Sequence, residues 1–156
     1  VATDAFLYGI DATLQYRFAR AWSIRSRTSL VRGRDLNRNE WLFQVPSDRT
    51  ENALLVTLPK AGSWSALEMS ASSTVVFEQS RIPVGLDFSG PPSTYHLVGL
   101  SATATRTLGK NELRVGLQAN NILNTAYRDY MDRFRYYADA RGTDVTFWVR
   151  YSFGKH

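Results

Sequence analysis

The most regular pattern in this chain is an alternation of apolar and polar residues at its two ends. In residues 6–18, apolar side chains recur at every second position. In residues 143–153, one face carries Val145, Phe147, Val149, Tyr151 and Phe153. A period of two places alternate side chains on opposite faces of a β-strand. We therefore predict a strand at each end, with one strongly apolar face.

Five further segments share this alternation, so seven strands are predicted in all. They cover residues 6–18, 22–30, 51–58, 64–78, 95–107, 112–121 and 143–153. Residues 32–48 contain Gly, Pro, Asn and Asp, which favour turns and loops. In the fifth segment, small residues at 101–105 leave open whether Leu97 or the set Val98, Leu100 and Ala102 shares the apolar face.

The connections between these strands alternate strictly in length. Short ones lie at 19–21, 59–63 and 108–111, and long ones at 32–50, 79–94 and 124–142. Outer-membrane barrels have short periplasmic turns and long extracellular loops, and aromatic residues at both ends of their strands. Seven antiparallel strands cannot close a barrel, because the two edge strands would run parallel. The fold class expected is therefore all-β, an antiparallel transmembrane β-barrel segment.

Composition narrows the class of protein further. The chain of 156 residues suffices for one domain and contains no cysteine, which excludes disulfides and thiolate metal sites. No apolar run reaches the roughly 18 residues of a spanning helix, whereas a spanning strand needs only about 9–11. The net charge of +5 comes mainly from arginines spread along the chain, so nucleic acid is not an expected partner. No signal peptide is visible, and we expect a chain that starts inside a longer protein.

The C-terminal half carries motifs that resemble a known family. Asn120-Asn121-Ile122-Leu123-Asn124 is followed by Tyr127, then Arg141-Gly142 and the closing Tyr151-Ser152-Phe153. This combination resembles the C-terminal end of TonB-dependent outer-membrane receptors, and residues 130–137 look most like members from Bacteroidota. Residues 42–49 are similar to a loop-to-strand connection of the same barrels.

The resemblance implies an architecture, a location and partners. Residues 1–153 would form about seven C-terminal strands of a roughly 22-stranded, plugged barrel in the bacterial outer membrane. Residues 154–156 would be a tail after Phe153, which normally ends such receptors. The plug domain is absent from this chain. The implied partners are outer-membrane lipid, the rest of the barrel and plug, the TonB complex through the plug, and the barrel-assembly machinery, for which Tyr151 and Phe153 resemble the assembly signal.

Candidate chemistry is sparse on the strands. No catalytic constellation, phosphate loop or metal site stands out, so neither an enzyme nor a cofactor is expected. Five arginines fall on the polar face of the predicted strands and are predicted to face a water-filled lumen: Arg17, Arg25, Arg27, Arg114 and Arg150. There they would pair with Asp11, Glu68 or plug carboxylates, or attract anionic substrates.

The richest candidate site is the loop 127–137. Tyr127, Tyr130, Phe134 and Tyr137 follow helical spacing, which predicts a short helix with an aromatic stripe. Such a helix could pack on a neighbouring loop or form a lid over an anionic or planar ligand. The ligand-contact candidates are Tyr127, Arg128, Tyr130, Arg133, Phe134, Arg135, Tyr136 and, beside another long loop, His96.

Three functions remain open from the sequence. The resemblance implies energy-coupled import of a scarce ligand, such as a metal chelate or siderophore, haem, cobalamin or an oligosaccharide. The alternatives are a porin-like or structural outer-membrane barrel without TonB coupling, and a soluble ligand-binding β-barrel.

Overall fold

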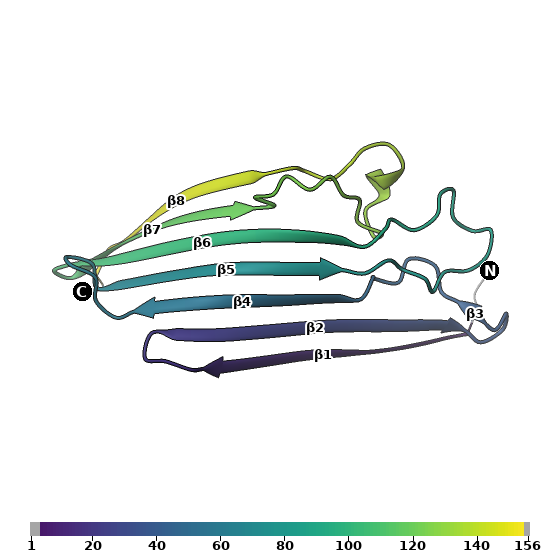
Figure 1. The fold of residues 1–156 in the computed structure, drawn as a ribbon, viewed down its shortest axis with the longest axis horizontal. Coiled ribbons are helices and arrows are strands. Elements are labelled where there is room, and N and C mark those ends of the chain that lie inside the picture. The colour runs from purple at the N-terminus through teal and green to yellow at the C-terminus, as the bar shows by residue number, and fades with distance from the viewer. Residues whose placement is uncertain (1–3, 155–156) are drawn as a thin grey trace.

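The computed structural model describes residues 4–154, and in this range the chain forms one antiparallel sheet (Figure 1). The strands are β1 (Ala5–Arg17), β2 (Trp22–Asp35), β3 (Glu40–Trp41), β4 (Arg49–Leu58), β5 (Ala66–Val76), β6 (Tyr95–Leu108), β7 (Asn111–Asn120) and β8 (Asp144–Ser152). Their order is β1-β2-β4-β5-β6-β7-β8, and β3 pairs only with β2. A 3₁₀ helix, η1 (Arg133–Tyr136), lies in the last long loop. No helix in residues 4–154 is long and apolar enough to cross a membrane.

All seven predicted strands are confirmed, but the boundary after residue 30 was wrong. Residues 32–35, expected in a loop, continue β2 because the first half of β1 pairs with them, from Val31 opposite Gly9 to Asp35 opposite Ala5. The chain then turns at Asp35, whose Oδ1 accepts the N–H groups of Asn37 and Arg38. Residues 40–41 return as β3, so the long connection is a strand extension with a turn at its tip.

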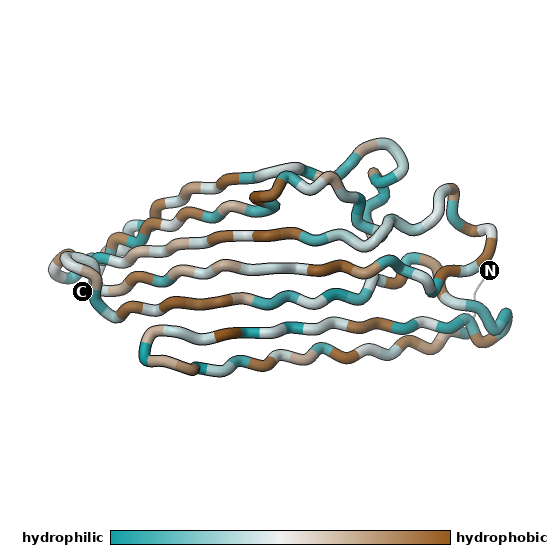
Figure 2. The backbone as a smooth tube through the Cα atoms, viewed as in Figure 1, coloured by the Kyte–Doolittle hydropathy of each residue, from teal (hydrophilic) through white to brown (hydrophobic). Residues whose placement is uncertain are grey.

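Register settles the face of every strand, including the fifth. Directly paired residues of antiparallel strands project to the same side. One row runs Tyr16, Ile24, Leu54, Ala71, Leu100, Ala119 and Val145 across the sheet. Leu100 therefore lies on the apolar face with Val98 and Ala102, and Leu97 lies on the other. Figure 2 shows the resulting alternation along each strand.

The apolar band drifts along the strands from one edge of the sheet to the other. Relative to the row just described, the large apolar residues of β1 (Tyr8, Ile10 and Leu14) lie toward the long loops. Those of β8 (Phe147, Val149 and Tyr151) lie toward the short turns. Such a drift is expected of the tilted, staggered strands of a β-barrel, because neighbouring strands are shifted in register relative to the barrel axis.

Most large apolar side chains of the strands are exposed on the apolar face. Only four hydrophobic residues in the described part of the chain are buried: Val45, Ala53, Val76 and Tyr130. Val45 and Tyr130 belong to the long connections and Val76 ends β5, so three of the four lie where the loops pack over the sheet end, whereas Ala53 lies inside β4. Within residues 4–154, no second layer covers the apolar face of the sheet (Figure 1).

Two local geometries explain residue choices in the C-terminal half. Asn121 and Asn124 have positive φ angles of 49° and 52°, a conformation that Asn tolerates better than most residues. The Asn121 side chain accepts the Thr125 N–H and donates to the Thr125 carbonyl, both at 2.9 Å. The motif found in the sequence is therefore a turn that ends β7. In β7, Gly116 lies under the Trp148 ring, and a Cβ there would come within 2.2 Å of it.

Candidate ligand site on the long loops

A buried ion pair joins the two largest loops. Arg135, from the loop between β7 and β8, donates to the carboxylate of Asp87, from the loop between β5 and β6. Their side chains are only 4% and 6% exposed. The Tyr136 hydroxyl donates to the other Asp87 oxygen at 2.6 Å, and the Arg135 guanidinium lies over the Tyr130 and Tyr136 rings at 4.8 and 4.3 Å. Both charges are thus compensated within a desolvated contact.

This contact perturbs the titration of its members. Burial alone would raise the pKa of Asp87, but hydrogen bonds from Tyr136 and Arg135 outweigh it and hold that pKa below its ordinary value. The same hydrogen bond to Asp87 raises the pKa of Tyr136. The carboxylate is therefore ionised across the physiological range, and the contact between the loops persists there.

A second cluster fixes the loop between β5 and β6 to the end of β2. Arg32 donates to both Asp48 oxygens, at 2.6 and 2.9 Å, and Arg81 donates to one of them at 2.6 Å. The fully buried Gln79 donates to the Val45 and Pro46 carbonyls. Burial would raise the pKa of Asp48, but the hydrogen bond and charge of Arg32, together with Arg81, lower it. The three long connections thus form one packed layer.

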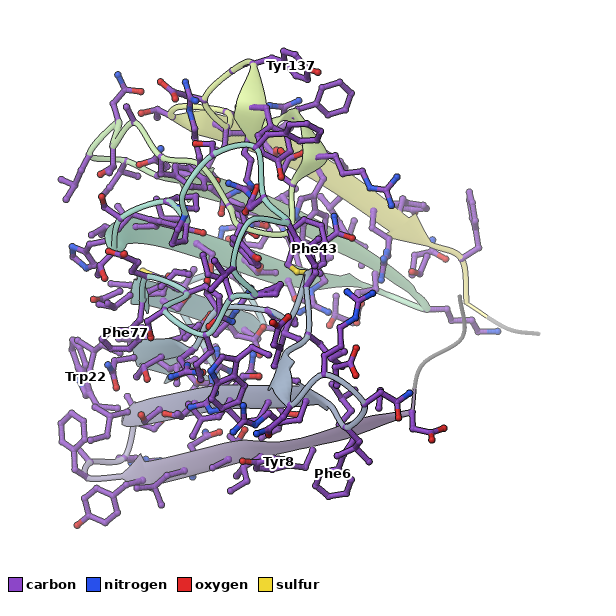
Figure 3. All side chains as sticks on the ribbon, turned by 90° about the vertical axis from the view of Figure 1, so that its right-hand side faces the viewer. Phe6, Tyr8, Trp22, Phe43, Phe77 and Tyr137 are labelled. Carbon is purple, nitrogen blue, oxygen red and sulfur yellow. The ribbon has the colours of Figure 1, made fainter. Side chains whose placement is uncertain are left out.

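An aromatic groove opens on this layer, with a volume of about 660 Å³. It is lined by side chains from all three long connections: Phe43, Leu86, Phe88, Arg133, Phe134 and Tyr137, with Gln44 and Tyr136 completing it. Phe88 is 96% exposed and Phe134 is 74% exposed. Seen from the loop end, Phe43 lies among the loops, whereas Trp22 and Phe77 lie at one side of the sheet, and Phe6 and Tyr8 project from β1 (Figure 3).

Such a groove can hold a ligand with flat apolar parts and negative charge. Exposed rings offer stacking surfaces, and the Arg133 guanidinium offers hydrogen bonds and charge. The rigid contacts beneath it, through Asp87 and Asp48, hold the loops in place without a ligand. Among residues 4–154, no cluster of three or more His, Cys, Asp or Glu is arranged to hold a metal ion.

The structure separates the sequence-predicted loop residues into two groups. Phe134, Arg133 and Tyr136 line the groove, whereas Tyr130 and Arg135 are buried beneath it. Arg128 pairs with Asp139 at 2.7 Å and donates to the Arg135 carbonyl, and Tyr127 stacks on Tyr95 at 4.6 Å between ring centroids.

The expected aromatic stripe on a helix was wrong. Only residues 133–136 are helical, as a single 3₁₀ turn capped by the Asp132 side chain. Tyr127, Tyr130, Phe134 and Tyr137 therefore do not share a face: Tyr130 is buried, whereas Phe134 and Tyr137 are exposed. The loop is instead held by residues distant in sequence: Asp87 accepts a hydrogen bond from Arg135, and the Tyr95 hydroxyl donates to Asp129.

His96 lies away from this groove. It is the second residue of β6, it pairs with Val75 on the apolar face, and its Nε2 is 2.8 Å from the Ser73 hydroxyl. Sequence reasoning missed Phe43, Leu86, Asp87 and Phe88. The signal available was an exposed apolar cluster, Leu86-Asp87-Phe88, inside a loop rich in Gly and Pro.

The five strand arginines share one face, opposite the apolar band. Register places Arg17, Arg25 and Arg27 on the same side as Arg114 and Arg150. Arg114 donates to Glu68 at 3.0 Å, as expected, and Arg25 and Arg27 lie 3.6 and 4.0 Å from Glu51. The Nε atoms of Arg25 and Arg114 are buried without a hydrogen-bond partner in the described residues. Because these two atoms are buried, the donors that this face offers to groups outside the chain are those of its exposed arginines, such as Arg17.

Arg150 and the terminal aromatics complete the last strand. Arg150 lies over the Trp148 ring at 6.0 Å, and Arg17 makes no ion pair within residues 4–154. Tyr151 and Phe153 are in edge contact at 4.9 Å, with Phe153 exposed at the short-turn end. Whether these two rings act as an assembly signal stays a prediction. Residues 155 and 156 of the predicted tail lie outside the described residues.

The fold is that of a segment of an antiparallel β-barrel, and the comparison with solved structures agrees. The chain superimposes on part of the copper transporter OprC with a TM-score of 0.74 and 18% sequence identity, over 98% of this chain and 24% of that one. The chain therefore spans about a quarter of the length of that solved protein. The fold class predicted from the alternation is confirmed. No family model and no curated protein matches the chain.

Proposed function

We propose that the chain is the C-terminal barrel segment of a TonB-dependent receptor in the bacterial outer membrane, and that the complete receptor imports a scarce ligand. One observation carries the proposal: an antiparallel sheet with one apolar face gathers its three long connections at one end, around an aromatic groove with an arginine. The barrel fold shared with the copper transporter OprC supports a transport role.

The polar face fits this role as the wall of a lumen. Its exposed arginines, such as Arg17, which makes no ion pair within residues 4–154, would meet carboxylates of a plug domain supplied by the rest of the protein. The TonB complex would act through that plug, and the barrel-assembly machinery would read Tyr151 and Phe153. The likeness of residues 130–137 to Bacteroidota receptors supports an origin in that group. No enzymatic activity is part of the proposal.

The groove narrows the ligand classes. Phe88, Phe134 and Tyr137 favour a ligand with flat or aromatic parts, and Arg133 favours negative charge. A metal chelate of the siderophore type or haem fits this chemistry better than a neutral oligosaccharide or cobalamin.

The test measures uptake by cells that carry the full-length receptor or lack it. Labelled iron-loaded catechol chelate, haem, cobalamin and an oligosaccharide would be compared, with and without a functional energy-coupling complex. We expect receptor-dependent uptake of the chelate or haem that stops without energy coupling. Receptor-dependent uptake that continues without energy coupling would favour the porin-like alternative, and a receptor that fractionates as a soluble protein would favour the soluble barrel.

A matched pair of variants tests the groove. Phe134→Ser removes an exposed ring from it, whereas Leu123→Ser removes an exposed apolar residue of the same loop that does not line it. Phe134→Ser loses one stacking contact worth about 0.5–1.5 kcal/mol, so it should weaken ligand binding by about two- to tenfold. Leu123→Ser should leave ligand binding unchanged.

A further inference from the structure

The apolar face contains a polar island. Register brings Ser26 of β2, Asn52 of β4 and Ser73 of β5 into one row, and Thr28 and Thr50 into the next row. The first row is flanked by Leu14 on β1 and Val98 on β6, and the next row toward the short turns is Ile24, Leu54 and Ala71. These five residues, Ser26, Thr28, Thr50, Asn52 and Ser73, are referred to as the polar island.

The row of Ser26, Asn52 and Ser73 lies within the height that lipid would cover, and the row of Thr28 and Thr50 lies near its outer limit. A tilted strand crosses the hydrocarbon region in about 9–11 residues. Counted from Leu58, beside the short turn that contains Lys60, this span ends near residues 48–50, beyond Asn52. Counted from Trp22 on β2, the span ends near residues 30–32, beyond Thr28. Arg32 and Asp48, which pair with each other, then lie at the outer edge, where charges are tolerated.

The island is incompletely satisfied by the chain itself. Thr28 and Thr50 share a hydrogen bond at 3.2 Å, and Ser73 bonds to His96. The Asn52 side chain is exposed and, like Ser26, makes no side-chain hydrogen bond to another residue in 4–154. A carboxamide facing hydrocarbon without partners is costly, because nothing in the lipid core replaces its hydrogen bonds to water.

The chemistry of the island selects one occupant. It contains no charged group, so it does not match an anionic lipid headgroup, which basic residues would bind. Its hydroxyls and carboxamide each carry both a donor and an acceptor, so the surface is complementary to itself. Beside it lies a hollow of about 270 Å³ that can accept apolar side chains of similar size. It is lined mainly by Leu14, Tyr16, Ile24, Ser26, Asn52 and Leu54, with Arg25 and Ala53 completing it.

We propose that the polar island is the contact surface for a second copy of this protein in the membrane. Two receptors have the same orientation in the outer membrane, so a two-fold axis along the membrane normal brings Asn52 of one copy to the height of Asn52 of the other. Each carboxamide then donates to and accepts from its counterpart, and Leu14 and Leu54 pack around the pair. The inference rests on the proposed membrane location but not on ligand import.

The experiment uses the full-length receptor in its native membrane, with single cysteines placed in this cysteine-free chain. Ser26→Cys reports on the island and leaves Asn52 in place, and Val149→Cys reports on the same face at β8. Each cysteine carries a fluorophore that brominated lipids quench, and a parallel sample is treated with a short thiol crosslinker. We expect Val149→Cys to be quenched, and Ser26→Cys to be protected and crosslinked into a species of twice the receptor mass.

The outcomes separate the two proposals. If Val149→Cys is not quenched, the membrane location fails and the proposed function fails with it. If both cysteines are quenched equally, or if Ser26→Cys crosslinks only to a different protein, the receptor is in the membrane but self-association through the island is wrong.

A substitution then tests the role of the carboxamide. Asn52→Leu keeps the size of the side chain and suits a lipid-facing position, so the barrel should still fold, as its resistance to unfolding in detergent would verify. Asn52→Leu should weaken self-association about tenfold, because a side-chain hydrogen bond between membrane-embedded segments contributes about 1–2 kcal/mol. Asn52→Ser, which keeps a donor and an acceptor, should weaken it less. Unchanged association in Asn52→Leu overturns the proposal.

Discussion

The buried ion pair between Arg135 and Asp87 should control the order of the groove-bearing loop. Asp87→Asn removes the negative charge and leaves the Arg135 guanidinium, which is 4% exposed, without a counter-charge. Breaking one partner of a buried pair costs about 3–5 kcal/mol. The strands do not depend on this contact, so the cost falls on the loop, which opens locally while the barrel stays folded.

Native-state hydrogen exchange of the full-length receptor measures this opening. Because 1.4 kcal/mol is a factor of ten, amides in residues 121–143 should exchange about 100-fold faster or more in Asp87→Asn. The amides of β5 and β6 should keep their protection, which shows that the barrel is intact.

The matched control is Asp139→Asn in the same loop. Asp139 pairs with Arg128 at 2.7 Å, but the two side chains are 53% and 44% exposed, so this surface pair is worth about 0–1 kcal/mol. Its loss should accelerate exchange less than about fivefold. If Asp87→Asn accelerates the loop no more than Asp139→Asn, the buried pair does not hold the loop, and the reasoning is wrong.

Three further outcomes are expected. Gly116→Ala forces the Trp148 ring out of its position and should destabilise the barrel by about 1–3 kcal/mol, which would lower its unfolding temperature in detergent. Gly90→Ala, which adds a methyl group in open space, should leave the unfolding temperature unchanged. Asn121→Ala strains a residue at positive φ and removes two side-chain hydrogen bonds, so the turn after β7 should lose about 1–3 kcal/mol, measured by exchange of the Thr125 amide. Because folding lowers the pKa of Asp87, its carboxylate stabilises the loop fully at pH values above the ordinary pKa of 3.8, and this stabilisation is lost as the pH falls through the lower folded-state pKa. The rate of amide exchange in the loop, corrected for its intrinsic pH dependence, should therefore be constant from about pH 5 to 8 and rise only in stronger acid.

The loop site could be predicted only in part. The sequence pointed to residues 127–137, and Arg133, Phe134 and Tyr136 do line the groove. Helical spacing misassigned the others, because aromatic residues at intervals of three and four also occur in irregular loops. Asp87, the residue that fixes Arg135, is 48 positions away, and no local pattern relates the two.

The alternation of side chains by itself determined the existence and order of seven strands, the succession of short and long connections and, for six of seven segments, the apolar face; it did not determine the end of β2 or the presence of β3. The alternation determined the former features because the period of two is a local property of extended backbone. For β6, the small residues at 101–105 carry no such signal, and only pairing with β5 and β7 selected the face of Leu100. Tertiary structure alone also produced the polar island, the buried ion pair and the groove, because each joins residues from strands or loops whose register and packing are set across the sheet and not along the chain.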